Sequence, residues 1–113
     1  MPIPSELQAL VDRLNQELDE IEQDSTIALH LVRQRLSLFP TNEILIQFFG
    51  ALNNILLFVE INRGRIQNLV HRISSDDVST EVVQDAGEDL GRILGRVLEV
   101  KMNANQLRNR LEN

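Results

Sequence analysis

Hydrophobic residues recur at helical spacings along most of the chain. In the first third they alternate at intervals of four and three, with one polar member: Leu7, Val11, Leu14, Leu18, Ile21, Ser25, Ala28 and Val32. This heptad pattern is typical of a helix that packs against other helices along one seam. Pro4 keeps the preceding backbone extended, as does Pro2, and Ser5 is a favourable N-cap. We therefore expect a first helix over residues 5–38.

Two features interrupt the predicted helical seams. In the first helix, Asp24, Ser25 and Thr26 are polar, but no glycine or proline accompanies them, so a break near Ser25 stays an open alternative to one continuous helix. In the second helix, Asn62 occupies a seam position, where a polar residue usually fixes register at some cost in stability. Gly64 follows it and lowers helix stability by roughly 1 kcal/mol relative to alanine, which leaves a kink open as well.

A second helix is expected over residues 42–73. Pro40 ends the first helix, and Thr41 or Asn42 can cap the next one. The seam of this second helix has an apolar residue at every seventh position and a further set between them: Leu45, Leu52, Val59, Ile66 and Ile73, with Phe48, Ile55, Asn62 and Leu69.

A third helix is expected over residues 79–112, after the polar turn formed by residues 74–77. Its heptad is the most regular of the three and consists of Val83, Ala86, Leu90, Ile93, Val97, Val100, Ala104, Leu107 and Leu111. Turns as short as the two predicted here force each helix to run antiparallel to the one before it. The sequence thus predicts an all-α fold, an antiparallel up-down-up three-helix bundle with long coiled-coil-like helices.

One domain over residues 1–113 fits a chain of 113 residues. The heptad pattern does not distinguish two arrangements: the third helix can pack within its own chain or be exchanged between two chains. Dimerisation of the bundle into a larger one is a further alternative that the pattern leaves open.

The stretch from Ile44 to Val59 contains no charged residue. It is too short for a membrane span of about 20 apolar residues and is interrupted by three amides. As a helix it is apolar nearly all round, which predicts burial on more than one side. We expect this helix to be the centre of the bundle, either fully covered by its own neighbouring helices or with part of its surface covered by a second chain. The candidate interface residues in this stretch are Ile46, Phe49, Leu56, Leu57 and Phe58.

Three of the five glycines recur at every fourth position of the third helix, as Gly87, Gly91 and Gly95. Each costs roughly 0.5–1 kcal/mol relative to alanine inside a helix. Glycines at this spacing form a groove that a neighbouring helix can enter. Three interpretations follow: a bulky residue of the second helix, such as Phe49 or Leu56, fills the groove, a second copy of the chain packs there, or the glycines have no particular role.

The charge distribution favours protein partners over nucleic acid or membrane surfaces. The net charge is −6, and the chain has no cysteine, tryptophan or tyrosine. A negative charge opposes binding to nucleic acid and to anionic lipid, and the lack of tryptophan and tyrosine disfavours base stacking. The acidic first helix and the acidic start of the third lie at the same predicted end as Arg63, Arg65 and Arg72, so we expect these arginines between two acidic helices.

No residue set indicates catalysis or cofactor binding. His30 and His71 should lie far apart, so they cannot share a metal, and no His-Glu-x-x-His motif occurs. The sequence after His30 lacks the leucine and glycine of the histidine phosphotransfer motif. We expect no catalytic, cofactor-binding or metal-binding residue and a non-enzymatic cytoplasmic protein–protein interaction module, an adaptor or regulator. Its expected partner is a second copy in a homodimer or another helical protein, with small-molecule binding or phosphotransfer as the alternative.

Overall fold

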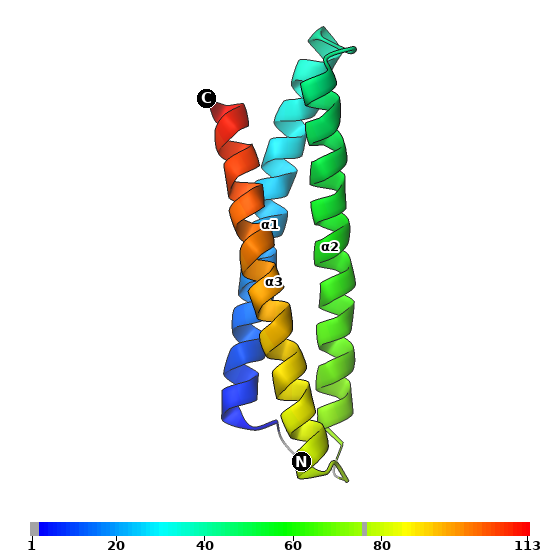
Figure 1. Cartoon of the computed structure of the whole chain (residues 1–113), viewed down its shortest axis with the longest axis vertical. Coiled ribbons are helices and arrows are strands. Elements are labelled where there is room, and N and C mark those ends of the chain that lie inside the picture. The colour runs from blue at the N-terminus through cyan, green and yellow to red at the C-terminus, as the bar shows by residue number, and fades with distance from the viewer. Residues whose placement is uncertain (1–2, 76) are drawn as a thin grey trace.

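The computed structural model describes residues 3–75 and 77–113 and consists of three long helices (Figure 1). Helix α1 spans Ser5–Leu38, α2 spans Glu43–Ile73 and α3 spans Thr80–Glu112. They run up, down and up in a rod of 58 × 19 × 16 Å. The predicted all-α three-helix bundle is confirmed, and its helix bounds agree with the prediction to within about one residue. Pro2 and Asp76, for which the sequence predicts extended chain and a turn, lie outside the described residues.

Polar side chains begin two of the three helices. The Asn42 side chain accepts a hydrogen bond of 3.0 Å from the backbone amide of Leu45, and the Ser79 side chain accepts one from Val82. The prediction that Ser5 caps α1 is wrong by one position. Pro4 is the capping residue and has no side-chain hydrogen bond, but its carbonyl accepts from the backbone amide of Gln8.

Both doubtful seam positions lie within continuous helix. Helix α1 runs through Ser25, which is fully buried, and its hydroxyl has no hydrogen-bond partner among the described residues. Helix α2 runs through Gly64. Asn62 is buried as predicted for a seam residue, and its side-chain amide donates to the Phe58 carbonyl at 2.8 Å. The bends that the sequence left open therefore do not interrupt either helix.

The core follows the predicted seams and divides into two clusters of buried apolar residues. The larger one occupies the end where α1 begins, and its buried members include Leu14, Leu18, Ile21, Val59, Ile66, Leu90, Ile93 and Val97. The smaller one lies toward the α1–α2 turn and consists of Ala28, Leu29, Val32, Leu45, Leu52 and Leu111. Each cluster takes residues from all three helices, so the third helix packs in the same chain.

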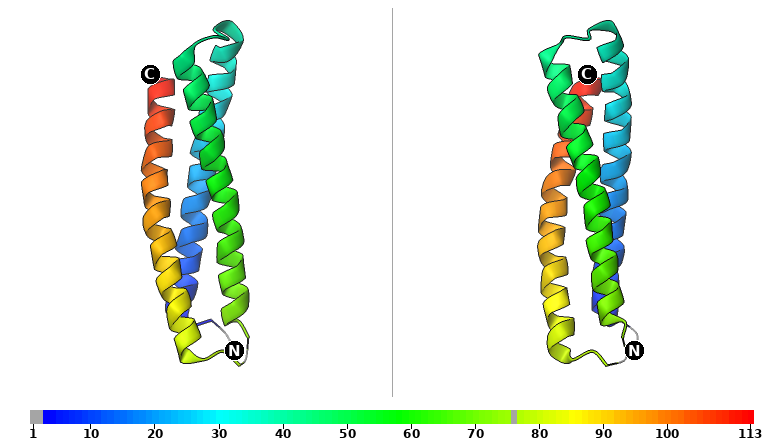
Figure 2. Two further views of the ribbon diagram at one scale, coloured as in Figure 1. Left: turned by 45° about the vertical axis from the view of Figure 1, so that its right-hand side comes forward. Right: turned by 90° about the vertical axis from the view of Figure 1, so that its right-hand side faces the viewer.

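Helix α1, and not α2, is the central helix of the bundle. It packs along its length against both α2 and α3, whereas α2 and α3 touch each other over a much smaller area (Figure 2). At the C-terminal end of α3, the Arg35 guanidinium of α1 donates a hydrogen bond to the Leu111 carbonyl.

The expectation of a central α2 is wrong because its buried strip is narrow. Between Leu45 and Val59 only one residue per heptad is fully enclosed, while Phe48 and Ile55 remain half-buried.

The buried hydroxyl of Ser25 leads to a stability prediction. Replacing Ser25→Ala should raise the free energy of unfolding by about 1–2 kcal/mol, because it removes an unpaired buried polar group and improves helix propensity. Urea unfolding followed by circular dichroism at 222 nm measures the change. Thr26→Ala, at the exposed neighbouring position, is the matched control and should gain only the propensity difference. A loss of stability in Ser25→Ala would mean that the hydroxyl has a partner.

Candidate functional site

The side of α2 that points away from the core is apolar and uncharged at its centre. We define the outer face of α2 as Ile46, Gly50, Asn53, Leu57 and Ile61. At 100° per residue these five positions lie together, opposite the buried strip. Ile46 is 49% exposed, and Leu57 and Ile61 are each 52% exposed. This outer face therefore carries three large apolar side chains that no other part of the described chain covers, with Gly50 and Asn53 between Ile46 and Leu57.

Helix α2 contains more apolar residues than the other two helices can cover. Only 17% of its most apolar stretch is buried in the bundle. By length and composition alone, α2 is the one helix among the described residues that could cross a membrane. Exposed apolar surface of this kind often marks an interaction site.

The structure separates the predicted interface residues of α2 into two groups. Ile46 and Leu57 lie on the outer face, as the sequence indicated. Phe49 and Leu56 instead pack against the smaller core cluster, and Phe58 packs against the larger one.

Arginines cover part of the two phenylalanine rings. The Arg33 guanidinium carbon lies 5.8 Å from the centre of the Phe49 ring, and that of Arg96 lies 5.9 Å from the Phe58 ring. Cations at this distance from a ring centre are attracted to its face. These aromatic residues already contribute to packing within the chain.

Sequence reasoning missed two members of the outer face, Ile61 and Gly50. Ile61 lies beyond the uncharged stretch, but its place four residues after Leu57 puts it on the same side of the helix. Gly50 was hidden because a glycine contributes no apolar side chain. A Cβ atom added at Gly50 would have no other atom within 4 Å, so this exposed position is open in the same way as Gly91 and Gly95, and we call it the hollow at Gly50.

The glycines of α3 do not form a filled groove. A Cβ atom at Gly87 would lie 3.1 Å from Leu7 Cδ2 of α1, whereas Gly91 and Gly95 have open space around them. The interpretation that Phe49 or Leu56 fills this groove is wrong. Positions four residues apart rotate by about 40° around a helix, so the stripe turns from α1 towards solvent along α3.

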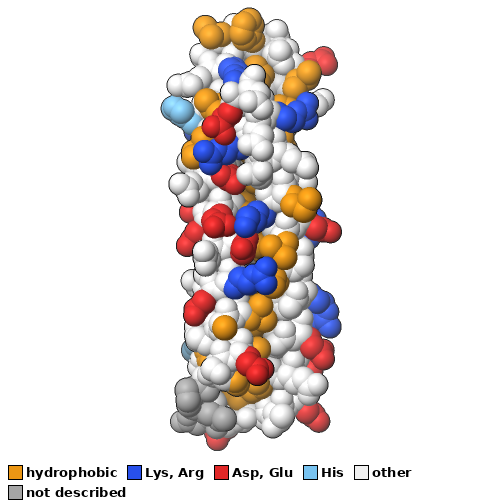
Figure 3. Space-filling view, turned by 90° about the vertical axis from the view of Figure 1, so that its left-hand side faces the viewer, with side chains coloured by type: hydrophobic (Ala, Val, Ile, Leu, Met, Phe, Trp, Pro, Cys, Tyr) orange, Lys and Arg blue, Asp and Glu red, His pale blue; other side chains and the backbone are white. Residues whose placement is uncertain are grey.

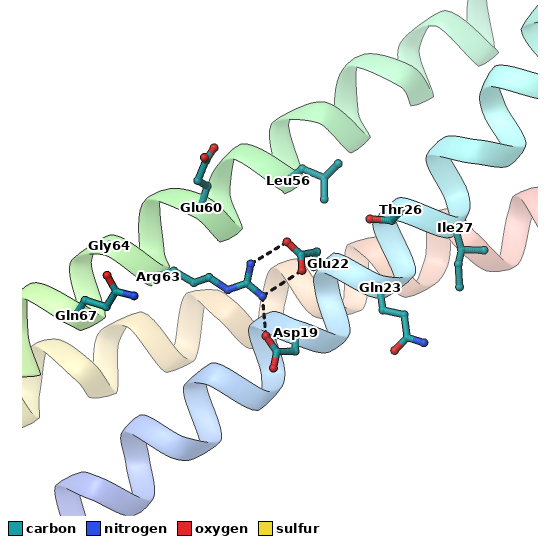
Figure 4. A pocket seen from close by; sticks show the side chains of 10 residues that line it. All are labelled: Asp19, Glu22, Gln23, Thr26, Ile27, Leu56, Glu60, Arg63, Gly64 and Gln67. Carbon is teal, nitrogen blue, oxygen red and sulfur yellow. Dashed lines mark hydrogen bonds and ion pairs between the residues drawn. The ribbon is translucent and has the colours of Figure 1, made fainter.

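An open groove of about 870 Å³ lies between α1 and α2, beside the outer face (Figure 4). Arg63 spans it from α2: its guanidinium donates to Glu22 at 2.8 Å and to Asp19 at 2.6 Å. Glu60 and Gly64 border the groove on the α2 side. The ion pairs of Arg63 therefore bridge the middle of the groove and link α2 to α1.

This network shifts the pKa values of its members. Hydrogen bonds to Glu22 and Asp19 raise the pKa of Arg63, and the hydrogen bond from Arg63 lowers the pKa of Glu22. The expected pairing of an arginine of α2 with acidic α1 is confirmed for Arg63. The expectation that the arginines lie between two acidic helices is wrong for Arg63, whose described ion pairs are all with α1. Arg65 and Arg72 are exposed and make no ion pair with any described residue.

The surface formed by α1 and α3 is highly charged, unlike the outer face of α2. Side chains of both signs are spread along its length (Figure 3). Lys101 lies 2.7 Å from Glu17 and 2.9 Å from Glu20, and Arg108 lies 2.6 Å from Asp24. Hydrogen bonds to Glu17 and Glu20 raise the pKa of Lys101. These pairs join α1 to α3 and leave that surface well solvated.

The two histidines occupy opposite ends of the antiparallel bundle. His30 lies near the C-terminal end of α1 and His71 near that of α2, and both are exposed. The Gln34 side chain is the one hydrogen-bonding neighbour of His30 among residues 3–75 and 77–113, at 3.2 Å. No group of three metal-binding side chains occurs in the described part of the chain.

No protein-family model, curated protein or solved structure matches this chain. Function is therefore inferred from its own residues and their arrangement.

The ion pair between Arg63 and Glu22 should make a small, pH-dependent contribution to stability. Since the pKa of Glu22 is lowered in the folded state, its contribution is present above the unfolded value of about 4.3 and is lost as pH falls through the folded value. Glu22→Gln should lower the free energy of unfolding at pH 7 by at most about 1 kcal/mol, since the pair is exposed. Below the folded pKa of Glu22, where its carboxylate is protonated in both states, the two proteins should be equally stable.

Urea unfolding across this pH range provides the measurement for Glu22→Gln. The control is Glu60→Gln, because Glu60 borders the same groove without an ion pair to a described residue. An effect of Glu22→Gln that persists unchanged at low pH would show that Arg63 does not act through the Glu22 charge.

The glycines of α3 allow a second comparison. Gly91→Ala should raise the free energy of unfolding by about 0.5–1 kcal/mol, because alanine is the better helix former and its methyl group meets open space. Gly87→Ala should gain less, since its methyl group must displace Leu7. Thermal unfolding at low protein concentration measures both. A destabilised Gly91→Ala would indicate that another chain approaches this position.

Proposed function

We propose that this chain is a non-enzymatic interaction module that self-associates through the outer face of α2, so that two three-helix bundles join into one larger bundle. One observation carries the proposal. Ile46, Leu57 and Ile61 are half-exposed on one side of a single helix, and no charged side chain lies between them on that side.

The size of the surface fits a modest interface. The outer face runs over sixteen residues from Ile46 to Ile61, so at 1.5 Å per residue and a width of about 10 Å it offers on the order of 250 Å² per partner. Two copies would bury about 500 Å² through this face, which lies in the range of weak, transient contacts. We therefore expect a weak, reversible dimer rather than an obligate one.

Electrostatics favour α2 over the other surfaces as the contact. Two copies each carry a net charge of −6 and repel one another. The face of α1 and α3 would have to lose the solvation of many charged groups on contact, which is costly. The outer face of α2 carries no charged group at its centre, so contact there avoids this desolvation cost. Because added salt screens the overall repulsion, higher ionic strength should strengthen the association.

A dimer built in this way leaves the charged surface of α1 and α3 free. Such a surface is suited to a second, electrostatically selected protein partner, as an adaptor or regulator requires. The acidic charge and the lack of cysteine support a cytoplasmic setting and disfavour nucleic acid as the partner.

Leu57→Glu should disrupt the dimer, because it places a charge at the centre of the apolar face. Sedimentation equilibrium with interference optics is needed, since the chain lacks tryptophan and tyrosine. The average mass of the wild type should rise toward twice the chain mass as the protein concentration increases. The dissociation constant of Leu57→Glu should rise at least about tenfold, equivalent to 1.4 kcal/mol. Met102→Glu is the matched control, since Met102 is an exposed apolar residue of α3.

Two results would contradict self-association through α2. One is a wild-type protein that stays monomeric across the concentration range. The other is a Met102→Glu variant that dissociates as readily as Leu57→Glu. Flotation with lipid vesicles separates a further possibility: binding to vesicles that is lost in Leu57→Glu would assign the outer face to a membrane surface in place of a second copy.

A further inference from the structure

Resting on the proposed self-association, we propose that the α2 helices of two copies pack antiparallel about a two-fold axis between Asn53 and Asn54. In this register, Leu57 of each chain fills the hollow at Gly50 of the other. The occupant of the outer face is thus a second copy of this chain, in one defined orientation.

The register follows from the spacing of residues along α2. In a two-fold dimer the same surface is used by both chains, so each contact occurs twice. Gly50 lies three residues before Asn53, and Leu57 lies three residues after Asn54. Ile46 and Ile61 lie seven residues before and after the same two positions. An axis between the two asparagines therefore pairs Gly50 with Leu57 and Ile46 with Ile61.

Each of these pairs is complementary in shape or in chemistry. Leu57 is a large exposed side chain, and Gly50 offers open space where any other residue would carry a Cβ atom. A glycine inside a helix is unfavourable by itself, so close approach of a partner gives this one a purpose. Ile46 and Ile61 form apolar contacts on either side of the central pair. Each outer face thus provides the bulky Leu57 side chain and also the open position at Gly50 that accepts Leu57 of the other chain.

The asparagines at the axis supply a polar contact that fixes the register. The side-chain amide of Asn53 donates to the Phe49 carbonyl at 2.9 Å, and the carbonyl oxygen of that side chain accepts no hydrogen bond from a described residue. In the antiparallel register Asn53 of the second copy lies one residue away along the axis, and the remaining N–H of its side-chain amide is a donor. A buried polar pair of this kind penalises neighbouring registers, in which an amide would be left unpaired.

Charge disfavours the parallel arrangement of the same two helices. With parallel helices each residue meets its own counterpart, so Glu60 would lie beside Glu60 of the second copy and Gly50 beside Gly50, leaving the hollow empty. In the antiparallel register the residue opposite Glu60 is Gln47. The two copies of Glu60 are then thirteen residues apart along the axis, about 20 Å at 1.5 Å per residue.

This register encloses α2 on both sides. One side of α2 packs against α1 in its own chain, and the opposite side packs against α2 of the second copy. The expectation that α2 is a central helix would then hold for the dimer, although it is wrong for the single chain.

Disulfide crosslinking tests the register directly, since the chain contains no cysteine. Single-cysteine variants Asn53→Cys, Ile61→Cys and Met102→Cys, and the double variant Ile46→Cys with Ile61→Cys, all change exposed positions. Circular dichroism checks that each remains helical. Each variant is oxidised mildly and separated on a non-reducing gel, and sedimentation equilibrium is run in parallel.

The antiparallel register predicts a specific pattern of links. Asn53→Cys and the double variant should form covalent dimers at least about tenfold faster than Met102→Cys. The two copies of Asn53 lie one residue, about 1.5 Å, apart along the axis, and Ile46 lies opposite Ile61, so these thiols are held at high effective concentration. Ile61→Cys alone should link no faster than Met102→Cys, since its two copies lie about 22 Å apart at 1.5 Å per residue and a disulfide requires Cα atoms within about 7 Å.

Other patterns overturn the register and remain distinct from a failure of self-association. Fast linking of Ile61→Cys alone would show parallel helices. A dimer in sedimentation with no preferential linking of Asn53→Cys would place the contact elsewhere on the chain. A monomer in sedimentation with no preferential linking would remove the proposed self-association itself.

Discussion

The packing of α1 against two partners at once is the interaction on which the rest of this bundle depends. Its seam is fully enclosed along most of its length, from Val11 to Val32, because α2 covers one flank and α3 the other. Ion pairs from Arg63 on α2 and from Lys101 on α3 reach acidic residues of α1 from opposite sides. Their individual contributions are small, but they favour the same pairing as the apolar seam.

The central place of α1 determines what remains uncovered. Since α2 and α3 meet α1 more than each other, α2 is attached along one narrow strip, and its remaining apolar surface faces outwards. The chain could have resolved this by placing charged residues on the outer face, as it does on α1 and α3. Instead Ile46, Leu57 and Ile61 occupy that face, with Gly50 as a hollow between them. This conflict between composition and burial is the physical basis for proposing a partner.

Much of the fold could be predicted from the sequence, because heptad spacing and turn residues act locally. The three helices, their antiparallel order and the buried seam, including Ser25 and Asn62, follow from periodicity. Which helix is central could not be predicted from apolar content, since a heptad identifies the side that is buried but not the number of neighbours that cover it. The α3 glycines misled for a similar reason: their spacing suggests a groove, yet only Gly87 faces another helix.

The candidate surface was predictable in part. Ile46 and Leu57 were identified because they lie off the apolar seam, whereas Phe49, Leu56 and Phe58 were chosen for the same apolar character and proved to pack within the chain. Distinguishing these groups requires the positions of α1 and α3, which periodicity does not supply. Gly50 could be assigned to the candidate surface only from the structure, which shows that no other atom lies near it.

The most direct test of a self-complementary α2 surface is a nuclear Overhauser measurement filtered for contacts between chains, on a mixture of isotopically labelled and unlabelled protein. The proposed packing predicts cross-peaks from the Leu57 methyl groups of one copy to the Gly50 α-protons of the other. Cross-peaks between chains that arise only from α1 or α3, or none at concentrations where a dimer forms, would contradict it.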